Sequence, residues 1–378
     1  MGPSGARPAP HRLLAVLALV TLAGAGLTGL PHPLPAAATW HLLFAVGALP
    51  MILAAMAYFI PVLTRTGPAP ACVALAPLAA LATGTAIVGH FAGLLSTARV
   101  WAPWLGLAAL AGFLAWCRGR RRACLGRPNP CFAWYVTAQA FLVLGLAAVA
   151  VSALRPEWAA PLRRFHLHAN LLGFMGITAL GTLQVLLPTV VHQPDPEAAV
   201  RLRRHLWPVA VGAMAMAAGA ALWTPLAVAG ALLYAWPWAV LLRAASRLLR
   251  AHGGRNVLPL LAGALAGLGL VLGQGMVHGT GFAAARDSLP LFAIAFLLPL
   301  VSGALGQLLP VWLRPGLQAP WHARARRRLA RGAALRGLAL PVAGMAAALG
   351  YQAGPAVALL AAGWLAALAM ATLGDRSP

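Results

Sequence analysis

The chain has 378 residues, of which 61% are hydrophobic and only 9% charged, and its mean hydropathy is +0.81. This composition excludes a soluble globular protein, because apolar stretches long enough to cross a bilayer follow one another along the sequence. The net charge of +23 does not indicate nucleic-acid binding, since every basic residue is an arginine and the arginines cluster between hydrophobic segments. We expect a membrane protein whose partner is the lipid bilayer, with no nucleic acid.

The apolar segments predict an all-α polytopic membrane protein with twelve spans in a single domain, residues 1–378. The first span follows Arg7 and Arg12 and has some features of a cleaved signal peptide, but the repeat described below favours a retained span. The predicted ranges are 13–30, 41–63, 71–96, 101–117, 132–153, 166–191, 207–223, 225–244, 256–277, 288–312, 332–350 and 354–373.

The arginines predict how the chain crosses the membrane. Both termini and the loops between spans 2–3, 4–5, 6–7, 8–9 and 10–11 hold most of them, including the clusters Arg118, Arg120, Arg121, Arg122, Arg127 and Arg324, Arg326, Arg327, Arg328, Arg331. The opposite loops hold only Arg99, Arg155, Arg163, Arg164 and Arg286. Cytoplasmic loops are enriched in arginine, so both termini are expected in the cytoplasm, and even-numbered spans begin at the outer side. The expected location is a bacterial inner membrane.

Spans two, six and ten share a pattern that indicates an internal repeat. Each ends near a proline (Pro61, Pro188 and Pro310), and twenty residues before that proline stand His41, His168 and Pro290. The spacing predicts three units of four helices each, approximately 1–126, 127–252 and 253–378. Cys72, Cys117, Cys124 and Cys131 match no metal-binding pattern and are expected to be unpaired thiols.

Five histidines are expected at one level near the outer face: His41, His90, His166, His168 and His278. His11, His32, His192, His205, His252 and His322 fall in predicted loops or tails and are expected to be exposed to solvent. Ionisable residues inside a bilayer are costly and mostly functional, and imidazole is a common metal ligand. Five histidines at one depth therefore favour a cofactor site over five unrelated interfacial residues.

His166 and His168 form the most informative pair. Residues at i and i+2 on an α-helix point about 200° apart, so the two side chains suit two separate partners better than one shared metal ion. Small residues nearby (Gly173, Gly176 and Gly181) suggest room for a flat macrocycle such as haem. Arg163 and Arg164 lie just before the pair, where guanidinium groups are suited to pair with haem propionates.

The segment His166-Leu-His168-Ala-Asn-Leu-Leu-Gly173, continuing to Pro188, resembles the His-x-His helix of haem-copper oxidase subunit I. The likeness is greatest to cbb-type cytochrome c oxidases and nitric oxide reductases, and smaller NnrS-like membrane proteins with haem and copper are similar in size. The resemblance implies twelve spans in a pseudo-threefold array and one or two haems b near the outer face. His166 would be the proximal ligand of the high-spin haem and His168 a ligand of the low-spin haem. An electron-donor protein on the outer side and a role in oxygen or nitric oxide chemistry are implied as well.

The sequence departs from that family in the placement of its ligands. The His-x-His helix is the tenth span in the oxidases but the sixth here, and span seven lacks the copper-binding histidines. In one alternative the site has moved by one unit, so that His41 and His90 take the places of the copper ligands opposite His166, and His168 faces His278. The other makes His41 a haem ligand, as span-two histidines are in the family. Both stay open.

Acidic residues bear on whether the protein is an enzyme. The predicted spans contain no Asp, Glu or Lys, which argues against proton pumping. Whether the protein is an oxidase-like or nitric oxide reductase-like oxidoreductase is left open by the sequence. Two other functions remain: a solute or metal transporter that uses the outer histidines as an entry site, and an assembly subunit without a cofactor.

Overall fold

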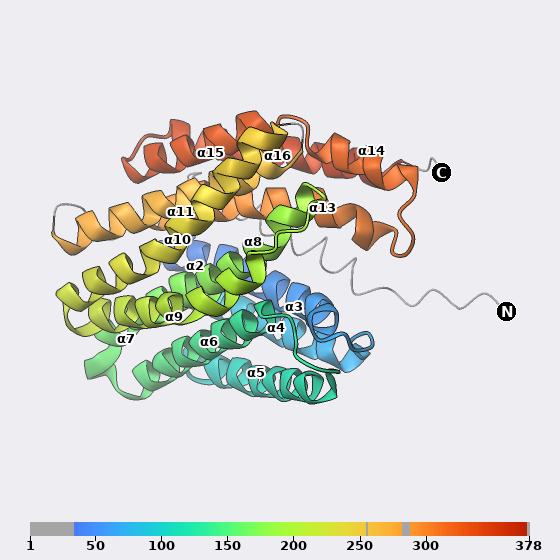
Figure 1. The fold of residues 1–378 in the computed structure, drawn as a ribbon. Helices are drawn as coiled ribbons and strands as arrows, with labels where there is room; N and C mark the ends of the chain where they lie inside the picture. The colour runs from blue at the N-terminus through green and yellow to red at the C-terminus, as the bar shows by residue number, and fades with distance from the viewer. Residues whose placement is uncertain (1–33, 255, 282–287, 376–378) are drawn as a thin grey trace.

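The computed structural model describes residues 34–254, 256–281 and 288–375, which form helices and turns without any strand. Ten helical segments in these ranges are long and apolar enough to cross a membrane, so the chain is a multi-pass helical membrane protein. Figure 1 shows the helices running side by side in one bundle, with α7 at the left end and α14 at the right end.

The helices follow the predicted spans closely. In chain order they are α2 (Ala36–His41), η1 (Leu42–Ala48), α3 (Leu49–Thr64), η2 (Ala71–Ala74), α4 (Leu75–Phe91), α5 (Ala98–Ala123), α6 (Cys131–Leu154), η3 (Pro156–Trp158), α7 (Ala159–His168), η4 (Ala169–Gly176), α8 (Ile177–Val190), α9 (Ala198–Leu222), α10 (Thr224–His252), α11 (Leu258–Gly279), α12 (Ser288–Leu291), η6 (Phe292–Leu297), α13 (Leu298–Leu313), α14 (Pro320–Leu329), α15 (Ala333–Ala348) and α16 (Ala353–Leu373).

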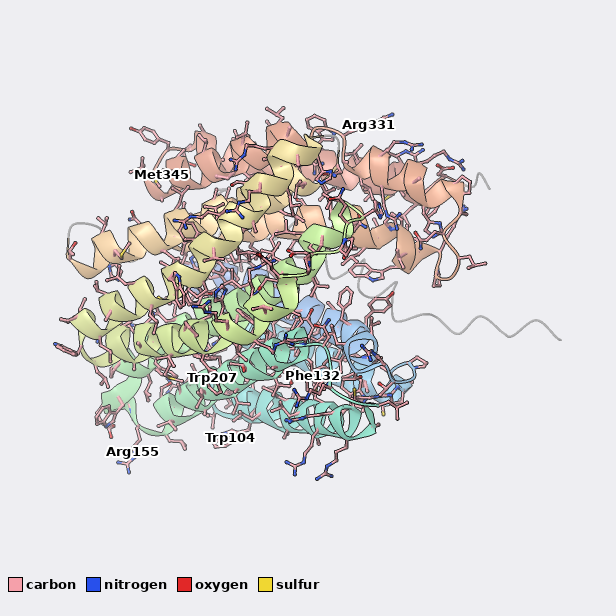
Figure 2. The ribbon with its side chains drawn as sticks, in the orientation of Figure 1. Trp104, Phe132, Arg155, Trp207, Arg331 and Met345 are labelled. Atoms are coloured by element: carbon pink, nitrogen blue, oxygen red, sulfur yellow. The ribbon has the colours of Figure 1, made fainter. Side chains whose placement is uncertain are left out.

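Two of the twelve predicted spans are not among the ten. The range 13–30 lies outside the described residues. The range 332–350 forms α15, which has only 16 residues. At a rise of about 1.5 Å per residue such a helix is about 24 Å long, less than the about 30 Å of a bilayer's hydrocarbon core. It still returns along the bundle, since Figure 2 places Arg331 and Met345 towards opposite ends of this segment.

Three segments form the centre of the bundle: α2 to α3, α7 to α8, and α12 to α13. The most apolar windows of the last two are 83% and 78% buried, the highest values among the ten spanning segments. The first and third meet through aromatic contacts, with Phe44 and Phe292 ring centroids 5.9 Å apart and those of Tyr58 and Trp312 6.5 Å apart. Glycine allows close approach elsewhere: a Cβ at Gly267 of α11 would collide with the Ala295 carbonyl of η6.

Each of these three central segments contains a π-helix at the same place. The stretches η1, η4 and η6 begin one or two residues after His41, His168 and Pro290, respectively. Such widened turns are rare and often lie at functional sites. The three-unit organisation remains a prediction, and this shared break in helix geometry is an independent observation in its favour.

The C-terminal ends of α3 and α8 are also built alike. Arg65 and His192 each stand four residues after the helix's proline, with left-handed φ values of 52° and 54°. The next N–H bonds back to the proline carbonyl in both, from Thr66 to Pro61 at 3.0 Å and from Gln193 to Pro188 at 3.1 Å. This is the hydrogen-bond pattern of a Schellman cap, which satisfies carbonyls that the helix end leaves unpaired.

Candidate functional site

The five histidines predicted at the outer level all lie at helix ends and are half-buried. His41 is the last residue of α2, His168 is the last residue of α7, and His166 precedes it by two positions. His90 and His278 are the next-to-last residues of α4 and α11.

The two histidines of α7 interact with different partners. His41 is the histidine that interacts electrostatically with His166, whereas His278 interacts with His168. This division agrees with the geometry of a helix, on which residues i and i+2 point about 200° apart. The chain thus places His41 within electrostatic reach of His166, and His278 within electrostatic reach of His168.

Four of these rings are held through Nδ1. A backbone carbonyl can only accept a hydrogen bond, so each Nδ1 carries the proton and each Nε2 keeps a lone pair. Histidines that ligate metals are commonly oriented in this way, with the other ring nitrogen donating to a backbone carbonyl or carboxylate. The accepting oxygens are those of Ala37 for His41 (2.7 Å), Gly145 for His166 (2.9 Å), Arg164 for His168 (2.9 Å) and Leu95 for His90 (3.2 Å).

Asn170 of η4 completes the support of His166. Its amide nitrogen donates to the His166 carbonyl at 2.8 Å and lies 3.1 Å from Nδ1 of the ring. The amide rests against Gly145 of α6, where an added Cβ would lie only 2.5 Å from Asn170 Nδ2. We call Gly145, His166 and Asn170 the histidine clamp.

His90 approaches this group through an aromatic ring. The Phe91 ring centroid lies 5.0 Å from that of His41 and 5.3 Å from that of His90. No group of three or more His, Cys, Asp or Glu side chains that could hold a metal ion occurs within residues 34–254, 256–281 and 288–375. The copper alternative, with His41 and His90 as ligands, stays a prediction.

Arg163 and Arg164 are both exposed, on the turn of α7 that precedes the histidines. Within the described part of the chain, neither forms an ion pair with a carboxylate; the pairs there involve Arg155, Arg201 and Arg328. The two guanidinium groups are thus available to an anionic partner near His166 and His168. Their assignment to haem propionates stays a prediction.

The glycines of η4 and α8 have a different role from the expected one. Gly173, Gly176 and Gly181 leave no slot for a macrocycle, because aromatic side chains from neighbouring helices pack on them. The open positions lie instead on α11, where a Cβ at Gly273 or Gly275 would meet nothing within 4 Å. Gly275 stands three residues before His278, on nearly the same side of the helix. The side chains that occupy the first three glycines are Phe141, Tyr234 and Trp134, respectively.

Two histidines expected to be exposed are buried. His205 of α9 is 6% exposed and His322 of α14 is 2% exposed. The helix α9 begins at Ala198, ahead of its predicted span, and α14 is a separate helix within a predicted loop that packs against α13 and α16. His322 accepts a hydrogen bond from the Ala319 N–H at 3.0 Å, and its Nε2 donates to the Arg314 carbonyl at 2.8 Å. His192 is exposed and His252 half-buried, while His11 and His32 lie outside the described residues.

The cysteines are unpaired, as expected: Cys72, Cys117, Cys124 and Cys131 are free thiols. Cys117 and Cys131 are buried within the bundle. Cys117 contacts Gln139, whose amide also reaches Met56 at 3.7 Å. The side chains of Cys117, Gln139 and Met56 contact one another inside the packed core, so they hold neighbouring helices together.

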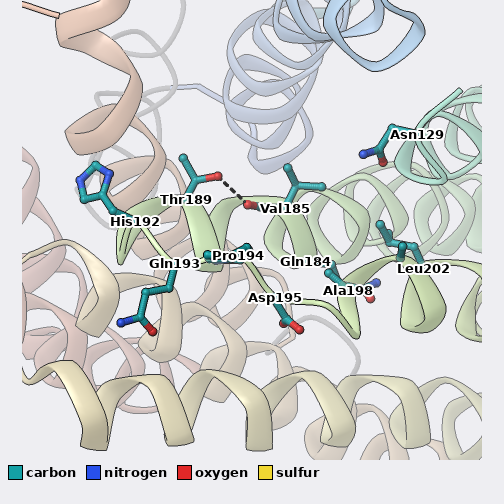
Figure 3. A pocket seen from close by; sticks show the side chains of 12 residues that line it. Asn129, Gln184, Val185, Thr189, His192, Gln193, Pro194, Asp195, Ala198 and Leu202 are labelled. Carbon is teal, nitrogen blue, oxygen red and sulfur yellow. Dashed lines mark hydrogen bonds between the residues drawn. The ribbon is translucent and has the colours of Figure 1, made fainter.

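Sequence patterns gave no sign of a cavity at the opposite end of α8. It has a volume of about 460 Å³ and includes Gln184, Thr189, His192 and Asp195 in its lining. Figure 3 shows these side chains around the turn that joins α8 to α9, with the Thr189 hydroxyl donating to the Val185 carbonyl at 2.8 Å. Among the described residues, no group forms a hydrogen bond with the buried Oε1 atom of Gln184.

Asp195 on the rim of this cavity is an anchored carboxylate. Partial burial by itself would raise its pKa, but the hydrogen bond and charge of Arg201, with the N–H groups of Glu197 and Ala198, hold the pKa below the ordinary value of 3.8. Arg201 also bonds Glu197 at 3.4 Å. The arginine therefore ties the start of α9 to the turn that precedes it.

Comparison with known proteins adds no family assignment. No family model matches the chain, and no curated protein matches its sequence.

Proposed function

We propose that this chain is a b-type haem-binding membrane protein of the haem-copper oxidase-like superfamily. Its haem sites would lie at His166 and His168 of α7, which we call the histidine fork. The observations that carry the proposal are that His166 and His168 each have a different histidine, His41 and His278, within electrostatic reach, and that Nδ1 of His41, His166 and His168 is held by a backbone carbonyl. A haem iron needs one or two axial histidines, whereas a metal ion held by protein alone needs three or four ligands. Pairs of histidines favour haem.

The residues present fit such a group. Nδ1 of His41, His166 and His168 is held by a backbone carbonyl, which leaves Nε2 as the coordinating atom of each ring. The surface of α11 is open at Gly273 and Gly275, beside His278. Copper is not part of this proposal, since no observation favours it.

When bound, haem supplies a one-electron redox couple tuned by its axial ligands and surroundings. The residues of the chain would perform three tasks around it. His166 and His168 offer imidazole nitrogens on opposite sides, and the histidine clamp fixes the orientation of the first ring. Arg163 and Arg164, exposed just ahead of the pair, would neutralise propionate groups. The buried helices η4 and α8 would exclude water from the inner side.

The setting we propose is a bacterial inner membrane, with the histidine fork near the outer face and both termini in the cytoplasm. An electron-donor protein on the outer side would then reach the site directly. The protein would act in electron transfer or in accessory roles around oxygen or nitric oxide chemistry. Proton pumping is not proposed, because the predicted spans contain no carboxylate or lysine.

Optical spectra of the purified protein, oxidised and dithionite-reduced, test the proposal. Wild type should show a Soret band and reduced α and β bands. His166→Ala and His41→Ala should remove or alter one spectral component, and His168→Ala and His278→Ala another. His192→Ala is a matched control, since His192 is exposed at the far end of α8.

Three outcomes would count against the proposal in different ways. Protein without a Soret band, and without iron by elemental analysis, would remove haem altogether. Loss of one identical band in both His166→Ala and His168→Ala would leave a single cofactor and refute the two-sided geometry. Metal-stimulated uptake into proteoliposomes by haem-free protein would favour a transporter that uses the same histidines.

A further inference from the structure

Of the helices that the structure describes, α14 has the highest proportion of arginine. It lies between the spanning segments α13 and α16 in sequence and packs against both. Its ten residues, Pro320–Leu329, include Arg324, Arg326, Arg327 and Arg328, and Arg331 follows in the turn before α15. Figure 1 places α14 at the end of the bundle opposite α7.

The apolar face of α14 packs against the rest of the protein, so the opposite face remains for contact with lipid. Trp321, Ala325 and Leu329 are each at most 1% exposed. The Arg314 guanidinium lies over the Trp321 ring, 4.2 Å from its centroid. The carbonyl of Asp375 accepts hydrogen bonds from Arg314 at 3.0 Å and from Trp321 at 3.2 Å. α14 is therefore fixed at the level where the spanning helices end, and it does not float free of the bundle.

Within the described residues, the positive charge of this region exceeds the carboxylate charge that pairs with it. Asp375 pairs with Arg328 at 2.9 Å. Arg327 and Arg331 are exposed to the surroundings. Figure 2 shows Arg331 at the edge of the bundle, where α14 gives way to α15.

A buried guanidinium beneath the turn adds a second observation. Arg336 of α15 is only 2% exposed. Its Nη2 donates to the carbonyls of Leu329 and Arg331, at 2.9 and 3.0 Å. Its Nε and Nη1 have no hydrogen-bond partner in the described part of the chain, and neither does Nε of Arg326. Buried charges in proteins are normally paired. Within the described residues no carboxylate pairs with Arg336, so this buried cation adds to the positive charge beneath the turn.

We propose that α14 and the turn to α15 bind the phosphate groups of anionic phospholipids, on the side of the membrane that the arginine distribution assigns to the cytoplasm. Guanidinium groups bind phosphate through paired N–H donors. The position of α14 between spanning segments puts these donors at headgroup depth, where the lipid is the nearest source of phosphate. Each arginine near an anionic membrane surface strengthens binding by about fivefold.

The test uses the full-length protein purified in a mild detergent, with Arg327→Gln/Arg331→Gln as the variant. Its matched control is Arg121→Gln/Arg122→Gln, which removes the same charge from exposed arginines of another loop on the same predicted side. Thermal unfolding midpoints are measured in mixed micelles with increasing phosphatidylglycerol, with phosphatidylcholine, and with inorganic phosphate. Lipid retained through purification is identified by mass spectrometry.

Phosphatidylglycerol should raise the midpoint of wild type and of the control, and phosphatidylcholine should not. The variant should need about 25-fold more phosphatidylglycerol for half of the rise, from two arginines at about fivefold each. Retained lipid should be enriched in phosphatidylglycerol in wild type and depleted in the variant. If the variant and the control lose the phosphatidylglycerol effect equally, general surface charge explains it, and the proposed site is wrong. If inorganic phosphate raises the midpoint as much as phosphatidylglycerol does, the ligand is a free anion and the lipid proposal is wrong.

Discussion

Gly145→Ala tests the histidine clamp directly, because the added methyl group must displace something. A Cβ at position 145 would lie 2.5 Å from Asn170 Nδ2 and 3.1 Å from its Cγ, while non-bonded heavy atoms prefer separations of about 3.5–4.0 Å. Either the Asn170 amide turns away and loses its bond to the His166 carbonyl, or α6 moves and the bond from His166 to the Gly145 carbonyl lengthens. Overpacking of this kind costs about 1–3 kcal/mol.

The cost is best measured against a glycine that has free space. Gly112 of α5 has nothing within 4 Å of its would-be Cβ. Both substitutions gain about 0.5–1 kcal/mol from replacing glycine within a helix, so the difference between them isolates the collision. Thermal unfolding in detergent should give Gly112→Ala a midpoint equal to or above wild type. Gly145→Ala should lie below Gly112→Ala, by about 2 °C per kcal/mol for a chain of this size.

A double-mutant cycle identifies the partner in the collision. Asn170→Ala removes the amide that the new methyl group strikes, so Gly145→Ala/Asn170→Ala should be more stable than the sum of the single effects predicts. Coupling between groups in contact is about 0.5–3 kcal/mol. Additive effects, or a Gly145→Ala protein as stable as Gly112→Ala, would show that Asn170 does not fill this space and would refute the clamp.

Two further substitutions probe other parts of the scaffold. Tyr234→Phe removes the hydroxyl that donates to the Leu172 carbonyl of η4 at 3.2 Å, and should lower the free energy of unfolding by about 1 kcal/mol, measured by chemical denaturation. Asp195→Asn should be less stable than wild type at neutral pH because it loses the charge pair with Arg201. Since the folded-state pKa of Asp195 lies below 3.8, that stability is present above 3.8 and is lost as the pH falls through the folded pKa, so the two unfolding midpoints should converge in acid. A constant gap at all pH values would contradict the pairing.

Much of the bundle follows from hydrophobic length alone. Apolar windows located most of the spans, and the spacing of Pro61, Pro188 and Pro310 pointed to the three segments that contain the π-helices η1, η4 and η6. The direction of His166 and His168 also followed from helix periodicity, since two residues apart on a helix fixes their angle whatever surrounds them. Composition and local helix geometry determine these features, and both can be read from the sequence without knowledge of tertiary contacts.

The remaining features depend on contacts that the sequence does not state. The π-helices η1, η4 and η6 are made of the same apolar residues as α-helical spans, so nothing in their composition marks the wider turn. His205 and His322 stand among arginines, which suggested solvent, but packing of α9 and α14 on the bundle buries them. The sequence shows that Gly176 has no side chain, but only the fold shows that the Tyr234 hydroxyl fills the space beside it.

The boundaries between the three predicted units explain why the histidine fork belongs to the second. His41 of the first unit interacts with His166, and His278 of the third interacts with His168. The first and third units meet instead through Phe44 and Phe292, which lie in the π-helices η1 and η6. Pro290 occupies the register of His41 and His168 but has no group that can bind a metal. The third unit can therefore reach a shared site only through α11, and the second unit alone supplies a histidine to two boundaries. A cofactor bound at each pair would join the second unit to both of its neighbours.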